Sequence, residues 1–441
     1  MEPVEGYGRP GVMWWLSELT RSHSTGGVFY GWRLVVIGFL IILVGREIGD
    51  GLIGPVWGSR TYQGEGIGPP WVPLVIAAYA LGGLASLWFA GWGADRLGPR
   101  KMAQIGLPLA GLVALLAVIP VPGVLEVAVA GLGALGMIGA YVPAVTALNN
   151  WFRDRLALAV ALMLFGAAIG AKIIGPLLTL LTLPQVVVDW RLLTVVCGAA
   201  ILAAALPLVR ALRDRPEDWG EHPDGLTPAP AASIPNYSWR EAVRSRQLWL
   251  LIAAGCCVAS AESIGAVYQW QIISRGDATF EAIDRIGMFQ DYASVAGILA
   301  GGLASYRFPV RWVLSGAAVA QAVGMAVLLP GLELGLLEVA VLRGLASGMG
   351  TAPTIAAVGI YFGRRSFGML TVMTFIITFV ASSAALPSSG YLSYLDAAAG
   401  VYISIFMAAA IVSLVGAGLY VMLGQPRLSP AQRAEEPAIS C

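Results

Sequence analysis

Long apolar stretches alternate with short polar connectors along almost the whole chain. Twelve of these stretches reach about 20 residues, which is the length that an α-helix rising 1.5 Å per residue needs to cross a bilayer. Unbroken apolar runs of this length favour membrane helices over the amphipathic elements of a soluble protein. The pattern predicts an all-α integral membrane protein with transmembrane helices at about 34–57, 72–94, 102–121, 124–150, 156–181, 190–210, 247–272, 285–305, 311–330, 334–361, 366–391 and 397–423.

One connector is much longer and more polar than the others. Residues 212–246 contain five prolines and separate the first six apolar stretches from the last six. This composition predicts a linker between two six-helix bundles, with a short amphipathic helix near its end, at Trp239–Arg246. The expected organisation is an N-terminal tail at 1–29, a bundle at 30–211, the linker at 212–246, a second bundle at 247–423 and a C-terminal tail at 424–441.

The two predicted bundles repeat one another. Adding 210 to the residue number aligns several pairs without a gap, among them Pro143 with Pro353, Trp151 with Tyr361 and Phe152 with Phe362. A single shift that aligns separate helices and connectors indicates an internal duplication. The same shift places Ser305 where the first half has Asp95, so the second copy has lost this acidic residue. We therefore expect two pseudo-symmetric bundles that differ at one acidic position.

Basic residues are unevenly distributed among the connectors. Those that follow the second, fourth, sixth, eighth and tenth apolar stretches carry most of the lysines and arginines, whereas the opposite connectors carry few. Positively charged connectors remain in the cytoplasm during membrane insertion. We therefore expect the linker and both termini on the cytoplasmic side of the plasma (inner) membrane.

The composition agrees with a membrane location and excludes several classes of function. Apolar residues make up 57% of the chain and charged residues 12%, about half the share in soluble domains. No basic tract predicts nucleic-acid binding. No phosphate-binding loop or nucleophile–base set predicts an enzyme. Because the cysteines show no metal-ligand spacing, we expect no metal and no other cofactor.

The connector between the second and third stretches has an unusual sequence, GWGADRLGPRK, at 91–101. Its glycines permit a tight hairpin and a close approach of helices. Asp95 can accept hydrogen bonds from a helix N-terminus or pair with an arginine. The basic side chains place the loop at the membrane surface. The pattern resembles the loop motif between helices 2 and 3 of the major facilitator superfamily.

The resemblance to this superfamily extends over about 30–423. It implies a transporter of two six-helix bundles that works by alternating access, with its binding site near the membrane midplane. It also implies that the loop acts as a conformational switch, through Gly91, Asp95, Arg96, Gly98, Arg100 and Lys101.

Six ionisable residues lie at bilayer depth, where charges are expensive and are often functional. Three fall within about one helical turn of the first stretch: Arg46, Glu47 and Asp50. The others lie in the fifth, seventh and tenth stretches: Lys172, Glu262 and Arg343. In one reading, these groups neutralise one another and lock the bundles. In the other, the basic residues receive an anionic substrate and the acidic residues take up a proton.

Two short stretches resemble one branch of the superfamily. Tyr30-Gly31-Trp32-Arg33 leads into the first helix, and Asn150-Trp151-Phe152 leads into the fifth. Both are similar to segments of monocarboxylate porters and oxalate–formate antiporters, which move small carboxylates, often with a proton or in exchange. The chain departs from that branch at 289–304, which lacks the arginine that commonly meets the carboxylate. An anion would need another cation here.

On this basis we expect a secondary transporter of a small organic anion such as a monocarboxylate, either proton-coupled or exchanging. Its expected partners are the anionic solute, a proton or counter-solute, and the lipid bilayer. The substrate-binding candidates are Arg46, Lys172, Arg343, Tyr141 and Trp270. The proton-coupling candidates are Glu47, Asp50 and Glu262. Two alternatives remain open: an exporter of amphipathic compounds, and a membrane receptor that has this fold but does not transport.

Overall fold

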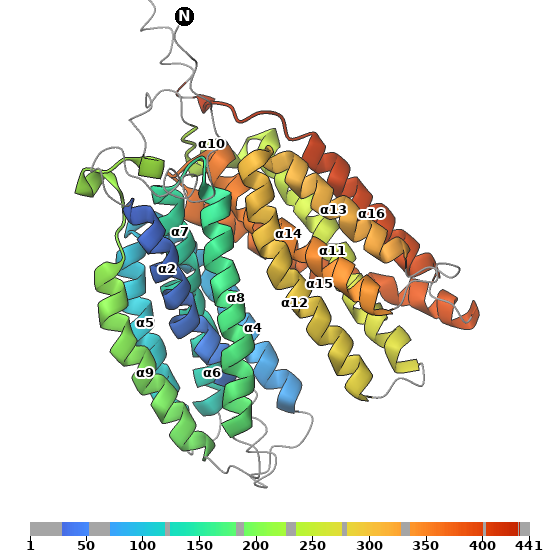
Figure 1. Ribbon diagram of the computed structural model, residues 1–441, viewed down its shortest axis with the longest axis horizontal. Helices are drawn as coiled ribbons and strands as arrows, with labels where there is room; N and C mark the ends of the chain where they lie inside the picture. Colours follow the sequence, from blue (N-terminus) through green and yellow to red (C-terminus); the bar gives the residue numbers. More distant parts are fainter. Residues whose placement is uncertain are drawn as a thin grey trace, which may run out of the picture.

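The fold was derived from a computed structural model of the 441-residue chain, in which every element of regular structure in the described residues is a helix. The described residues are 29–52, 71–119, 124–181, 189–225, 235–275, 280–327, 336–399, 403–430 and 432. The helices form two bundles that lie side by side (Figure 1).

The first half of the described chain contains six long helical segments. Local sequence signals define where some of them begin. Pro99 occupies the first turn of α5, and the side chain of Asp189 caps α9 by accepting a 2.9 Å hydrogen bond from the amide of Arg191. The elements are α2 (Tyr30–Ile42) with η1 (Leu43–Glu47), α4 (Trp71–Arg96), α5 (Pro99–Leu116), α6 (Val124–Leu135) with η2 (Gly136–Tyr141) and α7 (Val142–Trp151), α8 (Leu156–Leu181) and α9 (Trp190–Ala211).

The second half of the described chain also contains six long helices. They are α11 (Arg246–Arg275), α12 (Phe280–Arg307), α13 (Val310–Ala326), α14 (Leu336–Phe362), α15 (Phe367–Ala399) and α16 (Ile403–Val421). The linker contributes the short elements η3 (Glu217–Trp219), η4 (Pro223–Gly225) and α10 (Trp239–Val243). The helix expected near the end of the linker is therefore present as α10, which begins with a capping box between Ser238 and Glu241.

Many of these helices have the length and composition of membrane spans. Within the described residues, seven segments are long and apolar enough to cross a bilayer: Val124–Trp151, Leu156–Leu181, Trp190–Ala211, Arg246–Val267, Leu337–Phe362, Phe367–Pro387 and Ser404–Val421. Large apolar side chains are exposed on several helices, which water would disfavour and lipid would not, for example Val127, Leu192 and Val380. The predicted all-α membrane architecture of two six-helix bundles is confirmed.

The duplication is visible in the helix ends. α4 and α12 end at Arg96 and Arg307, and α8 and α15 begin at Leu156 and Phe367. These ends recur at a spacing of 211, since 307 − 96 and 367 − 156 both equal 211. The spacing of 210 that aligns the sequence letters is therefore one residue short of the structural register. At either spacing, the counterpart of Asp95 is not acidic, because it is Ser305 or Tyr306.

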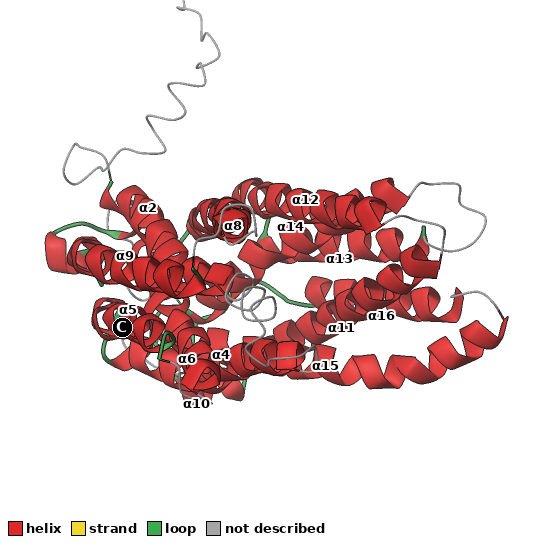
Figure 2. Cartoon of the chain, turned by 90° about the horizontal axis from the view of Figure 1, so that it is seen from below, coloured by secondary structure: helices red, strands yellow, loops and turns green. Residues whose placement is uncertain are grey.

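The two bundles meet along two seams, α8 with α12 and α4 with α15 (Figure 2). Figure 1 shows the helices converging at the end that carries the linker and diverging toward the other end. We call the converging end the linker end. One apolar core joins both bundles there, and its buried members include Trp151 and Phe152 from the first bundle and Ile355 and Phe362 from the second.

The segment that follows the last helix returns to the linker. The hydroxyl of Tyr237 donates a 3.1 Å hydrogen bond to the carbonyl of Leu428, and the amide of Asn236 donates one of 3.1 Å to Oε1 of Gln432. The chain thus enters and leaves the second bundle at neighbouring points.

Candidate functional site

Two helices contain π-helical turns that face one another. The first helix changes from α2 to η1 at Leu43–Glu47, and the fourth changes from α6 to η2 at Gly136–Tyr141. A Cβ added to Gly45 would lie 2.8 Å from the Cβ of Ala140, so the close approach requires glycine at position 45. A Cβ added to Gly136 would lie 3.4 Å from the carbonyl oxygen of Gly45. π turns are uncommon in proteins as a whole, but those that occur are often found at functional sites. This level of the bundle is therefore a candidate site.

Arg46 projects from the first π turn and is paired with both acidic residues of its own helix. Its Nε lies 3.5 Å from Oδ2 of Asp50 and 3.9 Å from Oε1 of Glu47. Tyr79 of α4 is hydrogen-bonded to Asp50. The three charged side chains are only 16–33% exposed. With one cation and two carboxylates, the group carries one excess negative charge when all three are ionised, and this charge is largely withdrawn from solvent.

The guanidinium of Arg46 also contacts the second π turn. Its Nη1 lies 3.5 Å from Sδ of Met137, and its Cζ lies 5.4 Å from the centre of the Tyr141 ring, which is a cation–π geometry. The Tyr141 ring in turn packs against Phe375 of α15, with 6.0 Å between ring centres. Since α15 belongs to the second bundle, Arg46 lies on the side of the first bundle that faces the second.

Lys172 lies on α8 and forms an ion pair with Asp291 of α12. This pair crosses a seam between the bundles, and both side chains are partly exposed. Lys172 is also close enough to Glu47 for the two charges to interact. The structure therefore associates Lys172 with the Arg46 group and adds Asp291 as its partner in the other bundle.

Glu262 and Arg343 form a separate group inside the second bundle. Arg343 is completely buried; its Nη2 lies 3.4 Å from Oε1 of Glu262, and its Nη1 donates a 3.2 Å hydrogen bond to the carbonyl of Gly265. A Cβ added to Gly324 would lie 2.7 Å from Cγ of Arg343, so the guanidinium stem is tightly enclosed. Oε2 of Glu262 is buried without a hydrogen-bond partner. Trp270 lies on α11, but its side chain is outside the described part of the chain.

The loop at 91–101 of the first bundle makes hydrogen bonds to the second bundle. Oδ1 and Oδ2 of Asp95 accept hydrogen bonds of 2.7 Å and 2.9 Å from the amides of Gly368 and Met369, in the first turn of α15. A Cβ added to Gly91 would lie 2.8 Å from the carbonyl oxygen of Gly368, so the two helices approach closely. Gly98 has a φ of 90°, which L side chains rarely adopt, and it permits the turn into α5. A carboxylate at a helix N-terminus satisfies orphan amides and complements the helix dipole.

The basic residues of the loop have less specific contacts. Arg96 lies over the ring of Trp92, 5.5 Å from its centre. The backbone amide of Arg100 donates a 2.7 Å hydrogen bond to Oδ1 of Asp214 in the linker. Lys101 is exposed.

Two acidic residues of the linker bind the first bundle. Asp214 receives the amide of Arg100, while Asp224 accepts hydrogen bonds of 3.0 Å and 2.9 Å from the amides of Arg153 and Asp154. Burial raises the pKa of both carboxyl groups above the ordinary value, and the amide hydrogen bonds act in the opposite direction. These contacts hold the linker against the start of α5 and the connector that precedes α8.

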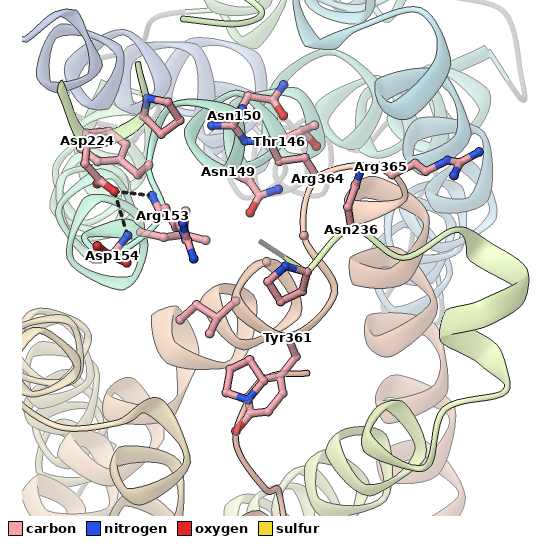
Figure 3. A pocket seen from close by; sticks show the side chains of 18 of the residues that line it. Thr146, Asn149, Asn150, Arg153, Asp154, Asp224, Asn236, Tyr361, Arg364 and Arg365 are labelled. Carbon is pink, nitrogen blue, oxygen red and sulfur yellow. Dashed lines mark hydrogen bonds between the residues drawn. The ribbon is translucent and has the colours of Figure 1, made fainter. Parts of the chain in front are cut away.

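A cavity of about 1410 Å³ lies at the linker end, between the linker and the ends of the bundles (Figure 3). Thr146 and Asn149, on α7, line its wall and are 3% and 2% exposed. Oγ1 of Thr146 and Nδ2 of Asn149 are buried without a hydrogen-bond partner. A Cβ added to Gly359 of α14 would lie 2.0 Å from Oδ1 of Asn149, so α7 and α14 are in close contact here.

Sequence reasoning identified the charged residues but missed the π turns and the role of the linker carboxylates. The glycines around Arg46 gave a weak signal for the first π turn. The Pro-Asp-Gly sequence at 223–225 is a turn signal that could have identified Asp224 as a capping residue.

Comparisons with known proteins agree on the fold. The sequence matches the profile of the Major Facilitator Superfamily over residues 29–276, which is more than half of the chain. No curated protein matches the sequence.

Several solved structures are similar to this chain over most of its length. FucP, a transporter of this superfamily in the outward conformation, is 16% identical with a TM-score of 0.70, covering 89% of this chain and 98% of its own. A second structure, of the E. coli fucose:proton symporter FucP, is 15% identical with a TM-score of 0.66 at 89% and 98% coverage. The proton:xylose symporter XylE is 12% identical with a TM-score of 0.64 at 92% and 98% coverage. At these identities the similarity demonstrates the fold alone.

Proposed function

The chain belongs to the major facilitator superfamily, and we propose that it carries a small organic anion, such as a monocarboxylate, across the membrane together with a proton. The observation that carries this proposal is the position of Arg46. Its guanidinium lies on the side of the first bundle that faces the second, over Tyr141 and beside two carboxylates. A substrate carboxylate could replace one of these acidic partners and form a charge-assisted, bidentate contact with the arginine.

Charge balance provides the reason for coupling to a proton. Arg46, Glu47 and Asp50 together carry one excess negative charge. Adding a monovalent anion would raise this to two excess negative charges at a site largely withdrawn from solvent, which is unfavourable. Protonation of Glu47 or Asp50 restores the original charge. The expected stoichiometry is therefore one proton for each monovalent anion. The solved proteins FucP and XylE are described as proton symporters, which supports this type of coupling.

Lys172 is the second cation proposed for the site. Its ion pair with Asp291 connects the bundles, and its charge acts on Glu47. An anion that draws Lys172 away from Asp291 would loosen that seam while binding. We propose that Arg343 and Glu262, by contrast, stabilise the second bundle, because Arg343 is completely buried and enclosed. Tyr141 is proposed to hold Arg46, and Trp270 remains a proposed contact only.

The contact between Asp95 and α15 suggests a gate, by which we mean the closed linker end. We propose that the linker end faces the cytoplasm, as the basic connectors indicate. Asp95 then holds the cytoplasmic side closed by binding the N-terminus of α15. The conformation is therefore closed toward the cytoplasm, and release of Asp95 is required before the substrate can leave on that side.

Flux measurements test the function. The purified protein is reconstituted into liposomes, and the uptake of labelled small carboxylates is measured with and without an inward proton gradient, with labelled fucose and xylose as neutral comparators. We expect uptake of a carboxylate that the gradient accelerates and that Arg46→Ala lowers about a hundredfold. Gradient-driven uptake of a neutral sugar alone would show that the anion proposal is wrong.

The same assay separates the alternatives. Thermal stabilisation by a carboxylate without any flux would favour a receptor. Extrusion of amphipathic dyes, with no carboxylate uptake or exchange, would favour an exporter.

A further inference from the structure

The first part of the linker is bound to the first bundle at two places. We call residues 213–225 the linker clasp. Oδ1 of Asp214 accepts a 2.7 Å hydrogen bond from the amide of Arg100 at the start of α5. The carboxylate of Asp224 accepts hydrogen bonds of 3.0, 2.9 and 3.3 Å from three successive amides, those of Arg153, Asp154 and Arg155. Asp224 has a φ of 58°, so the chain adopts an uncommon backbone conformation at this contact.

Aromatic contacts fix the clasp between these anchors. The guanidinium of Arg213 lies between the rings of Tyr30 and Trp219, 3.7 Å from the centre of each. The carbonyl of Arg213 accepts a 3.2 Å hydrogen bond from Nε1 of Trp151. The clasp therefore has a defined conformation on the surface of the first bundle.

One side chain of the clasp reaches the second bundle. Oε1 of Glu217 lies 2.8 Å from Nη1 of Arg364, in the connector that leads into α15. At the structural spacing of 211, Arg364 is the counterpart of Arg153, because 364 − 153 is 211. The clasp thus binds the equivalent connector of each bundle. Asp224 binds the connector of the first bundle, and Glu217 binds that of the second.

The carboxylates that bind across the linker end do not come from equivalent positions of the two bundles. Asp95 of the first bundle binds the amides of Gly368 and Met369 on the second. The corresponding position of the second bundle is not acidic, because it is Ser305 or Tyr306. The hydroxyl of Ser305 instead donates a hydrogen bond to the carbonyl of Gly301 in its own helix. Glu217 supplies a second carboxylate, and it acts on the same corner as Asp95, the start of α15.

We propose that the linker clasp is a second latch of the gate, in which Glu217 holds Arg364 and the carboxylates of Asp214 and Asp224 are positioning residues. An exposed ion pair contributes little when two free side chains must be ordered to form it. Anchoring the clasp removes much of that ordering, so that Glu217 is presented to Arg364 in advance. The linker end then opens only when both Asp95 and Glu217 release α15. This inference uses the proposed alternating cycle, but its test does not depend on flux.

Distance measurements between spin labels test the latch directly. Labels are placed on cysteines introduced at Gln104 of α5 and Arg307 of α12, two exposed positions at the linker end, in a variant whose native cysteines are replaced. Pulsed electron–electron double resonance is recorded on the full-length protein in lipid nanodiscs. We expect one dominant short distance in the reference protein. Glu217→Gln, Arg364→Gln and Asp224→Asn should each increase the long-distance population several-fold.

Two variants distinguish a latch from general destabilisation. The charge reversal Glu217→Arg with Arg364→Glu should return the distribution to that of the reference. Asp218→Asn removes an equal charge from the neighbouring exposed position and should leave it unchanged. Asp224→Asn is the most informative variant, because Asp224 contacts only the first bundle in the hydrogen bonds described. Unchanged distances in Glu217→Gln and Asp224→Asn, with thermal unfolding like that of the reference, would overturn the proposal.

The outcome is separable from that of the proposed transport. Altered distances in a protein that carries no carboxylate would support the latch and refute the transport assignment. Normal uptake with unaltered distances in every clasp variant would refute the latch alone.

Discussion

The carboxylate of Asp95 accepts a 2.7 Å hydrogen bond from the backbone amide of Gly368, although the two residues are 273 positions apart. The bond connects the end of α4 in one bundle to the first turn of α15 in the other. It is made to a helix N-terminus, where amides lack partners and the dipole favours negative charge. The bundles must separate here if the linker end is to open, so we expect this contact to favour the closed form.

Asp95→Asn should weaken this contact without disturbing the fold. The amide oxygen of Asn still accepts one hydrogen bond, but the charge and the second acceptor are lost, at a cost of about 1.4 kcal/mol or a tenfold shift in the equilibrium. We expect a larger fraction open at the linker end and about tenfold slower uptake, with thermal unfolding nearly unchanged. Asp218→Asn, which removes one carboxylate charge from an exposed position of the linker, is the control. Wild-type uptake by Asp95→Asn would remove the latch from the mechanism.

Gly91→Ala should prevent full closure of the same seam. The added Cβ would lie 2.8 Å from the carbonyl oxygen of Gly368 and 3.1 Å from Cγ2 of Val372, so the helices must move apart by a few tenths of an ångström. Gly316→Ala is the matched control, because a Cβ there meets nothing within 4 Å. We expect uptake to be several-fold slower in Gly91→Ala and unchanged in Gly316→Ala. Spin-label distances would show the change, and equal behaviour of the two variants would contradict it.

Arg46→Ala should affect both stability and transport. It leaves Glu47 and Asp50 without their nearest cation, and the partly exposed site should lose about 1–2 kcal/mol of unfolding free energy. Uptake should fall by about a hundredfold, since an ionic hydrogen bond to the substrate is worth about 2–3 kcal/mol. The double variant Arg46→Ala with Asp50→Asn should regain thermal stability but not uptake. Recovery of uptake in the double variant would show that Arg46 is only structural.

Neutral replacements of the acidic residues should separate proton coupling from binding. Asp50→Asn and Glu47→Gln each mimic the protonated form of one carboxyl group, so the variant at the coupling residue should no longer respond to a proton gradient. Exchange of labelled for unlabelled anion at equal pH should persist, because it needs no net proton movement. The measurement compares gradient-driven uptake with exchange in the same liposomes. If both variants keep their gradient response, the proton is carried elsewhere.

Much of the architecture could be predicted because the positions of the long apolar stretches indicate where the membrane helices lie. Long apolar stretches leave the backbone no alternative to helices in lipid. The loop around Asp95 was also predictable, since glycines, a carboxylate and basic residues at that spacing suit a hairpin that contacts a helix N-terminus. The register of the repeat was not, because similar letters at a spacing of 210 concealed helix ends that recur at 211.

The details of the site depend on contacts between distant segments. The π turn at Leu43–Glu47 exists beside another π turn, at Gly136–Tyr141, and neither sequence specifies the other. The ion pair of Lys172 with Asp291 required the relative placement of both bundles. Arg343 read as one of several deep cations, whereas its enclosure by Gly265 and Gly324 is a matter of packing that no local pattern reveals.

The bond from Tyr237 to the carbonyl of Leu428 also has a consequence for biogenesis. Leu428 follows the last helix, so this tie cannot form until the ribosome has synthesised the whole of the second bundle. The anchors of Asp214 and Asp224 lie on residues made much earlier, and they can form while the rest is still being translated. A nascent protein would therefore present a finished first bundle for some time before the second one is secured.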